Sequence, residues 1–186
     1  MADQMSICTP EEVYAFWFEE CSRENWFEAS LELDEEIRAR FRDTHLALAG
    51  GVVGIWRANP TNRLAAVIVL DQFARNIYRG TALAFATDGL ALQEAKDALA
   101  VSADLAISEE CRAFFYMPFE HSEDLVEQER AVELFAALGD AEYLDYAMRH
   151  RDVIATFGRF PHRNAMLGRA SRPSELEYLA RPDAGF

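Results

Sequence analysis

The chain has 186 residues, of which 51% are hydrophobic and 27% are charged, and its formal net charge is −14. A chain of this length suits one domain, and such a domain can bury most of its unfolded surface without the help of disulfides. The apolar fraction excludes wholesale disorder, and the acidic balance argues against nonspecific nucleic-acid binding. We therefore expect a single domain over residues 1–186.

The positive charges are unevenly distributed along the chain. Lys96 is the only lysine among the 18 cationic residues, so the others are arginines. Residues 1–148 hold 11 cations against 28 anions, whereas residues 149–186 hold 7 against 4. Because arginine keeps its charge when it loses water and lysine readily loses it, guanidinium suits a place where charge must survive burial. The charge pattern thus predicts an acidic body with a basic C-terminal part.

The cysteines and the termini indicate a compartment. Cys8, Cys21 and Cys111 are odd in number and fit no metal-ligand spacing, so we expect small buried side chains. The first ten residues lack the basic and apolar regions of a signal peptide. The longest apolar run, Leu64–Leu70, is far shorter than the ~20 residues of a membrane span. The sequence predicts a soluble cytoplasmic protein that does not enter a membrane.

Helix start and stop signals follow one another along almost the whole chain, beginning with a capping box at Thr9 and Glu12. The predicted helices run from Thr9-Pro10 to about Cys21, from Ser30 to Gly50-Gly51, from Asn59-Pro60 toward Gly80, from Thr87 onward, from Ser108 to Pro118, from Ser122 to Gly139, from Asp140 to about Thr156, and from Ser171 to Ala180. No stretch alternates with period two for long enough to be a strand. Since the connections are short, successive helices should be antiparallel neighbours, and the predicted fold is all-α.

The first polar motif interrupts a helix face that begins as core. Asp71, Arg75 and Arg79 are spaced four residues apart and continue the stripe of Ile68. One interpretation is a structural ion pair between adjacent helical turns. The other is that Asp71 holds an arginine whose guanidinium grips an anion, with Asn76 as a further ligand.

The second polar motif surrounds His121. Glu123 and Asp124 suit the first turn of a helix, where the macrodipole favours acids, and Ser122 is best explained as the cap. The flanking carboxylates would stabilise protonated His121, which suits a proton carrier or a metal ligand. Because the spacing of His121 and its acids matches no recognised ligand pattern, we predict no metal site, and a divalent ion stays an alternative.

The third polar motif spans residues 157–169 and has little periodic apolar pattern. Pro161 is expected to begin a short helix, which would leave the next three backbone amides without intrahelical acceptors. Free amides beside arginines favour anion binding. The other interpretation is a basic loop that neutralises the acidic body. The candidate ligand residues of this motif are Arg159, Arg163, Asn164 and Arg169, and His162 is a candidate catalytic residue.

His150 lies on an apolar helix face with Ile154. We expect a core histidine there, with a supporting role beside His162 as the alternative. His45 lies in a long amphipathic helix and is assigned no role.

Together these motifs resemble the bacterial domain-of-unknown-function family numbered 924. The residues that carry the resemblance are Phe16-Trp17-Phe18, Trp26-Phe27, the run from Asp71 to Arg79, the run from Pro118 to Asp124, the run from Phe157 to Asn164, and Leu167-Gly168-Arg169. The resemblance implies an all-α fold similar to tetratricopeptide-repeat proteins, with antiparallel helical hairpins in a right-handed array around a groove. It implies no reaction.

The favoured functional hypothesis is an Arg- and His-lined pocket for a small anionic ligand, a carboxylate or a phosphate ester. General acid–base catalysis there would use His121 or His162, with Asp71 or Glu123 as the orienting partner. The alternative is an interaction module, similar to helical-repeat proteins, that binds an acidic peptide without catalysis. No cofactor is expected, and the sequence does not indicate an oligomeric state.

Overall fold

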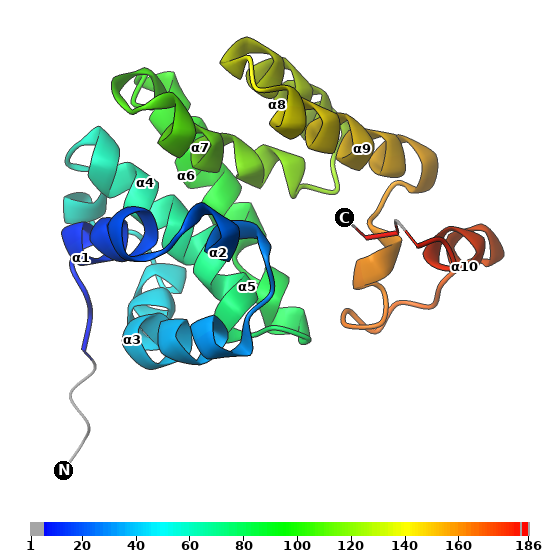
Figure 1. Cartoon of the computed structure of the whole chain (residues 1–186), viewed down its shortest axis with the longest axis horizontal. Helices are drawn as coiled ribbons and strands as arrows, with labels where there is room; N and C mark the ends of the chain where they lie inside the picture. Colours follow the sequence, from blue (N-terminus) through cyan, green and yellow to red (C-terminus); the bar gives the residue numbers. More distant parts are fainter. Residues whose placement is uncertain (1–5, 183, 186) are drawn as a thin grey trace. The chain divides into compact units, whose positions relative to one another are not determined.

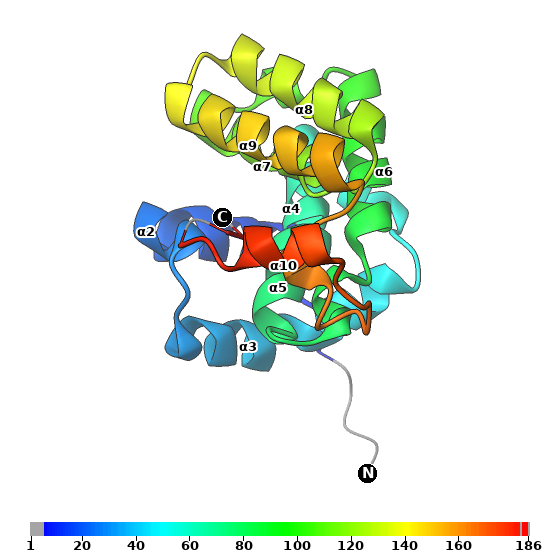
Figure 2. The ribbon, with the colours of Figure 1, turned by 90° about the vertical axis from the view of Figure 1, so that its right-hand side faces the viewer.

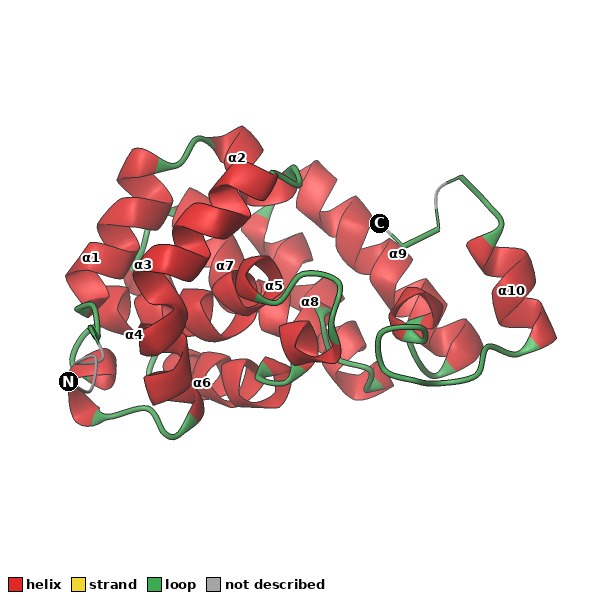
Figure 3. Cartoon of the chain, turned by 90° about the horizontal axis from the view of Figure 1, so that it is seen from below, coloured by secondary structure: helices red, strands yellow, loops and turns green. Residues whose placement is uncertain are grey.

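The computed structural model describes residues 6–182 together with residues 184 and 185. Helices and their connecting turns make up this part of the chain, and it contains no β-strand (Figure 1, Figure 3). The predicted all-α fold is therefore confirmed. No helix in the described residues combines the length and apolarity that a membrane crossing requires.

Backbone packing divides the chain into two compact units. The first unit comprises the residues up to Arg79 together with Leu83–Pro118, and the second comprises Gly80–Ala82 together with the residues from Phe119 onward. Division by packing does not decide whether the units fold separately, so the single domain over residues 1–186 stays a prediction. The right-handed tetratricopeptide-like array likewise stays a prediction.

The first unit is built from helices that carry its core on facing surfaces. Its elements are α1 (Pro10–Ala15), a π-helical turn (Phe16–Glu20), α2 (Arg23–Phe27), α3 (Leu31–Ala49), a 3₁₀ turn (Gly54–Arg57), α4 (Pro60–Ile68), a second π-helical turn (Val69–Phe73), α5 (Ala74–Ile77), most of a 3₁₀ turn (Ala82–Phe85), α6 (Asp88–Ala100), a 3₁₀ turn (Asp104–Ala106) and all but the last two residues of α7 (Glu109–Glu120). Helix α4 packs against both α1 and α6, and α3 packs against α5 (Figure 1).

Large aromatic side chains fill the centre of the first unit. Phe73 lies 4.7 Å from Phe41, 5.5 Å from Trp17 and 5.8 Å from Phe16, measured between ring centroids. These four side chains are essentially inaccessible to solvent. Edge-to-face and tilted ring pairs at these separations add to the stabilisation that comes from burial alone. The π-helical turns that hold Trp17 and Phe73 therefore lie at the core.

The second unit consists of a helical hairpin followed by a loop and a short helix. Its elements are α8 (Leu125–Leu138), α9 (Ala141–Phe157), a 3₁₀ turn (Pro161–Arg163) and α10 (Pro173–Leu179). Helices α8 and α9 lie side by side (Figure 2). Gly139 makes the sharp turn between them possible, because its φ of 84° lies in the left-handed region that glycine adopts without strain.

Most of the predicted helix starts are confirmed by their caps. The side chains of Thr9, Ser30, Asn59 and Asp140 each accept a hydrogen bond from a backbone amide in the first turn that follows. Thr87 precedes α6 as predicted, but its hydroxyl donates to the carbonyl of Leu70 at 2.6 Å instead of capping the helix.

Two local predictions were wrong, and one helix was missed. Helix α7 does not end at the proline, because Pro118 lies in its last turn and the helix continues two residues further, to Glu120. The cap of α8 is Asp124, whose carboxylate accepts from the amide of Val126, so Ser122 lies before the helix. The short helix α2 was not predicted, although Ser22 opens it with a capping box.

Candidate functional site

In the first polar motif, Arg75 is bound by two carboxylates of the first unit. Its guanidinium lies 3.2 Å from Asp71 one helical turn away and forms two hydrogen bonds with Asp88 at 3.0 and 3.2 Å. Asp71 is fully buried and also accepts a hydrogen bond from the amide of Gln72. The predicted pairing of Asp71 with Arg75 is confirmed. Because Asp88 stands at the start of α6, the same arginine links the α4–α5 region to α6.

Asn76 and Arg79 of the same motif converge on a different acid. Asp34, on α3, accepts from the amide of Asn76 at 2.8 Å and from Nη2 of Arg79 at 2.8 Å. Asp34 is almost completely buried, and the guanidinium of Arg79 and the amide of Asn76 hold the pKa of its carboxyl below the usual range despite that burial. These contacts tie α5 and the residues that directly follow it to α3. The geometry favours the structural interpretation for Asn76 and Arg79, and their role in ligand binding stays a prediction.

His45, to which the sequence assigned no role, is buried in a polar network of the first unit. Its Nε2 lies 3.2 Å from the hydroxyl of Thr87, and its Nδ1 lies 3.4 Å from the hydroxyl of Tyr78. Since Thr87 donates its own proton to Leu70, it accepts from Nε2 of His45. Burial lowers the pKa of His45, which keeps the ring neutral.

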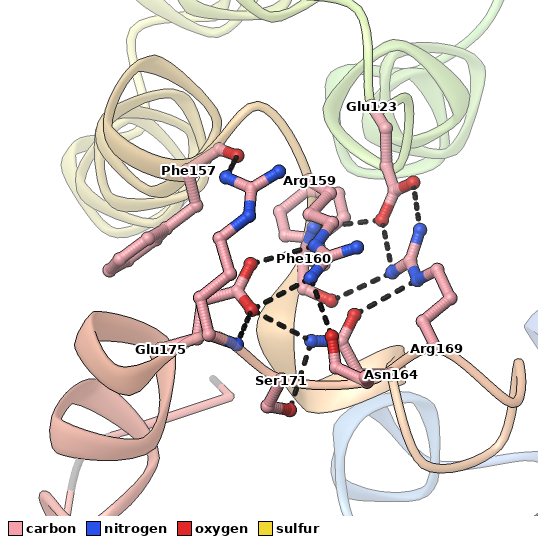
Figure 4. A network of polar contacts seen from close by, with 10 residues as sticks. Glu123, Phe157, Arg159, Phe160, Asn164, Arg169, Ser171 and Glu175 are labelled. Atoms are coloured by element: carbon pink, nitrogen blue, oxygen red, sulfur yellow. Dashed lines mark hydrogen bonds and ion pairs between the residues drawn. The ribbon is translucent and has the colours of Figure 1, made fainter.

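In the second unit, Glu123 is an ion-pair partner and not a first-turn acid. Arg169 donates two hydrogen bonds to its carboxylate, at 2.6 and 2.9 Å, and the amide of Phe160 donates a third at 2.8 Å (Figure 4). These donors hold the pKa of Glu123 below the usual range although partial burial acts against them. The explanation of Glu123 by the helix macrodipole was therefore wrong, because α8 begins two residues later.

Glu175, which the sequence analysis missed, organises the rest of the loop. It is fully buried on α10 and accepts two hydrogen bonds from Arg159, at 2.7 and 2.8 Å, and one from the amide of Arg172 at 2.6 Å (Figure 4). The paired guanidinium of Arg159 lowers the pKa of Glu175 to about 2. The sequence signal that could have found it is the position of Glu175 three residues after the helix cap.

Asn164 connects the two ion pairs. Its amide nitrogen lies 3.3 Å from the carboxylate of Glu175, and its amide oxygen accepts from Nε of Arg169 at 2.9 Å. Arg159, Asn164 and Arg169 thus form one hydrogen-bonded network with the two acids (Figure 4). Their donors are directed at side chains of the protein itself, which favours a structural role for these three predicted ligand residues.

Two of the three amides that were predicted to form an anion cradle at the Pro161 turn already have backbone acceptors. The turn is a three-residue 3₁₀ helix. The amide of Arg163 donates to the carbonyl of Phe160 at 3.1 Å, and that of Asn164 donates to the carbonyl of Pro161 at 3.0 Å. In a 3₁₀ turn the bonds close over three residues, so amides that an α-helix would leave open are already used.

A cluster of histidines surrounds Phe160 in the same unit. Phe160 is completely buried, and the guanidinium carbon of Arg163 lies 4.5 Å from its ring centroid. The rings of His150 and His162 lie 5.6 and 5.5 Å from it, and His121 lies 6.4 Å from His150. We call Phe160, Arg163 and the three histidines the Phe160 cluster. It brings the predicted residues His121, His162 and Arg163 together with the predicted core histidine, His150.

The electrostatics of the Phe160 cluster keep His162 neutral. Burial and then the charge of Arg163 lower the pKa of His162 to about 4, and His150 and His121 act in the same direction. Arg163 is only 6% exposed and keeps its charge there, because guanidinium resists deprotonation. At neutral pH, His162 is therefore a hydrogen-bonding group and a poor proton donor.

The predicted site residues are divided between the units. His121, Glu123, His162 and the loop arginines belong to the second unit, whereas Asp71, Arg75, Asn76 and Arg79 belong to the first. A single pocket that unites them stays a prediction. Within the described residues, no group of three or more His, Cys, Asp or Glu side chains is arranged to hold a metal ion.

The architecture places the chain among all-α proteins, and several of its arginines bind buried acids. Residues 13–183 match the model of a family described as bacterial protein of unknown function, DUF924, and the chain belongs to this family. A solved structure of a protein of unknown function from Agrobacterium tumefaciens is similar, with 41% identity and a TM-score of 0.88 over 92% of this chain and 96% of that one. Comparison with curated proteins gives no significant match.

Proposed function

We propose that the protein binds a small anionic molecule, a carboxylate or a phosphate ester, at Arg163 in the Phe160 cluster. The observation that carries the proposal is a permanently charged arginine that is buried, with its guanidinium against an aromatic ring among three histidines. A cation in such surroundings attracts an anion far more strongly than a surface arginine does.

In the sequence, Arg163 lies between two arginines that carboxylates hold in place. Arg159 and Arg169 each form a bidentate pair with one carboxylate, Glu175 and Glu123 respectively. These pairs fix the loop on both sides of the Pro161 turn. The position of Arg163 is thus set by a rigid frame, which is what a binding group requires for selectivity.

The histidines add hydrogen-bonding capacity to this charge. Neutral His162 offers one donor and one acceptor. An anion beside Arg163 would offset the positive field that lowers the pKa of His162, so binding should be accompanied by proton uptake in mildly acidic solution. This coupling distinguishes a ligand in the cluster from an ion on the surface.

The experiment is thermal unfolding of the full chain in phosphate, citrate or succinate against chloride at equal ionic strength. A ligand at a hundred times its dissociation constant stabilises by about 2.7 kcal/mol, which raises the melting temperature by about 5 °C or more. We expect this rise for the unmodified chain and its loss in Arg163→Met.

Arg130→Met is the matched control. It removes the same charge from the same unit, at an exposed side chain whose carboxylate partner is Glu133 on the same helix. This variant should keep the stabilisation by anions. Equal melting temperatures in chloride and in all three anions for the unmodified chain would refute the proposal and favour the alternative interaction module for an acidic peptide.

A further inference from the structure

Three hydrogen bonds in series run through the first unit from Tyr78 to Leu70. The hydroxyl of Thr87 donates to the carbonyl of Leu70 at 2.6 Å, because a carbonyl oxygen can only accept. Thr87 therefore accepts at 3.2 Å from Nε2 of His45, and this nitrogen must carry the proton. In the neutral ring Nδ1 is then an acceptor, and the hydroxyl of Tyr78 donates to it at 3.4 Å. All three bonds point in the same direction, so each one polarises the next.

The four residues, which we call the His45 series, come from segments that are separate in the sequence. His45 lies on α3, Tyr78 follows α5, Thr87 precedes α6, and Leu70 belongs to the π-helical turn Val69–Phe73. Such turns are rare and are often found at functional sites. Because His45 stands in the middle of the series, the loss of its two bonds would disconnect α3 from the start of α6 and from the end of α5.

Burial makes the middle of the series sensitive to charge. His45 is only 3% exposed and Thr87 only 6%. A second proton, at Nδ1, would turn the acceptor of the Tyr78 hydroxyl into a donor and would place a full charge in the protein interior. Burial alone lowers the pKa of His45, so the folded chain favours the neutral ring.

The ionisable neighbours of His45 offer little compensation for such a charge. On α3 and on the segments packed against it, they are Cys8, Arg42, Asp71, Arg75, Tyr78, Arg79 and Asp88. Each arginine among them forms an ion pair with a carboxylate, so these charges offset one another. Burial raises the pKa of Cys8, which keeps its thiol uncharged.

We propose that His45 is an acid-sensitive switch, which holds the end of α3 to the start of α6 while its ring is neutral and releases it when the ring takes up a second proton. Release would free the hydroxyl of Thr87 and the carbonyl of Leu70. Each of these two residues directly precedes an acid that binds Arg75. Acid would therefore loosen the first polar motif without protonating the carboxylates in it.

The experiment is hydrogen exchange of backbone amides in the full chain as a function of pH. The open form binds the proton with the ordinary pKa of 6.5 and the closed form binds it only at lower pH, so acid favours opening. The closed form keeps its full advantage above pH 6.5. Below that pH, the opening equilibrium should rise by up to about tenfold per pH unit, after correction for the intrinsic effect of pH on exchange.

Two amides in equivalent positions serve as reporter and control. The amide of Ala91 donates to the carbonyl of Thr87 at 2.9 Å, four residues after the residue that precedes α6. The amide of Val13 donates in the same way to the carbonyl of Thr9 at 3.2 Å, at the start of α1. Both residues are completely buried. We expect the acid-dependent rise for Ala91 and not for Val13.

Three substitutions separate the proton from the hydrogen bonds. His45→Gln keeps an N–H donor for Thr87 but cannot become charged, so the acid dependence should disappear. Thr87→Val should accelerate the exchange of Ala91 at every pH, and Thr87→Ser, which keeps the hydroxyl, should restore slow exchange. Thr156→Val is the matched control, because that exposed hydroxyl also donates to a backbone carbonyl but lies on α9. It should leave Ala91 unchanged.

The tautomer provides a second measurement. In the side-chain ¹⁵N spectrum, neutral His45 should carry its proton on Nε2, and a proton on Nδ1 would overturn the proposal. So would exchange of Ala91 that does not accelerate below pH 6.5, or that accelerates equally with Val13, because the proton would then act on the whole unit. An acid dependence that persists in His45→Gln would assign the effect to another group and would likewise exclude the switch.

Discussion

Each unit contains an arginine-rich region, and the arginines of the two regions have different surroundings. In the motif from Asp71 to Arg79, both arginines reach acids that lie on other helices, Asp88 and Asp34. In the loop from Phe157 to Arg169, the outer arginines also reach acids, and between them Arg163 lies on the ring of Phe160. The first region uses its charge to join helices. The second also builds a frame that holds one cation in place.

The largest expected effect concerns the ring at the centre of that frame. Replacing completely buried Phe160 with Ala should lower the free energy of unfolding by about 3–5 kcal/mol, because it leaves a cavity under Arg163, His150 and His162. Urea unfolding measures the loss. Phe157→Ala is the comparison. The ring of Phe157 is only partly buried against the same core, so its removal should lower the free energy of unfolding by less. Equal losses would show that Phe160 has no special position.

The next effect tests the first region alone. Asp34→Asn removes the charge that holds Asn76 and Arg79 and should destabilise the chain by about 1–3 kcal/mol. Exposed Glu35→Gln on the same helix should change little. If the first region serves only to join helices, the melting-temperature response to phosphate stays intact in Asp34→Asn. A lost response would mean that this region takes part in anion binding after all.

Glu175 should make the free energy of unfolding depend on pH in the acid range. Its pKa in the folded chain, about 2, lies below the ordinary value of 4.5, so its stabilising effect is complete above pH 4.5. The effect is lost as the pH falls from 4.5 toward 2, because the unfolded chain binds the proton first. Glu175→Gln should be less stable near neutral pH and should lose this acid dependence. Glu177→Gln changes an exposed site on the same helix. This variant should keep both the stability near neutral pH and its dependence on acid.

The smallest expected effect belongs to His162. With a pKa of about 4 in the folded chain against an ordinary 6.5, the ring stays neutral while the unfolded chain takes up a proton. The free energy of unfolding should therefore decrease by about 1 kcal/mol as the pH falls from 6.5 to 4, after allowance for partial exposure of the ring. His162→Gln should remove this slope in urea unfolding measured across that range. An unchanged slope would place the responsible group elsewhere.

Local signals in the sequence predicted the helices well, because caps act within one turn. Thr9, Ser30, Asn59 and Asp140 all start helices where they were expected. The errors arose where a residue had a stronger distant partner. Thr87 satisfies a carbonyl of the neighbouring π-helical turn instead of its own helix, which no local pattern reveals.

The site was less predictable, because it depends on pairings across long stretches of chain. The sequence identified Arg163 and His162 from their unusual composition, and the pairing of Asp71 with Arg75 from its spacing. It could not find that Glu123 reaches Arg169, 46 residues away, or that Asp34 reaches Arg79, 45 residues away. The contact between Glu120 and His150 was missed for a similar reason. Glu120 and His150 lie on different helices, and each has an ordinary structural explanation when considered alone.

The bidentate pairs of Arg159 and Arg169 also have a consequence for proteolysis. Trypsin cleaves after arginine, and residues 157–169 offer it three arginines, of which two bind carboxylates and the third is buried. The folded protein should therefore resist cleavage in the loop, although the loop contains residues that trypsin recognises. The rate at which trypsin cleaves the loop would therefore measure how often the ion pairs of Arg159 and Arg169 open. This measurement requires no label and no ligand.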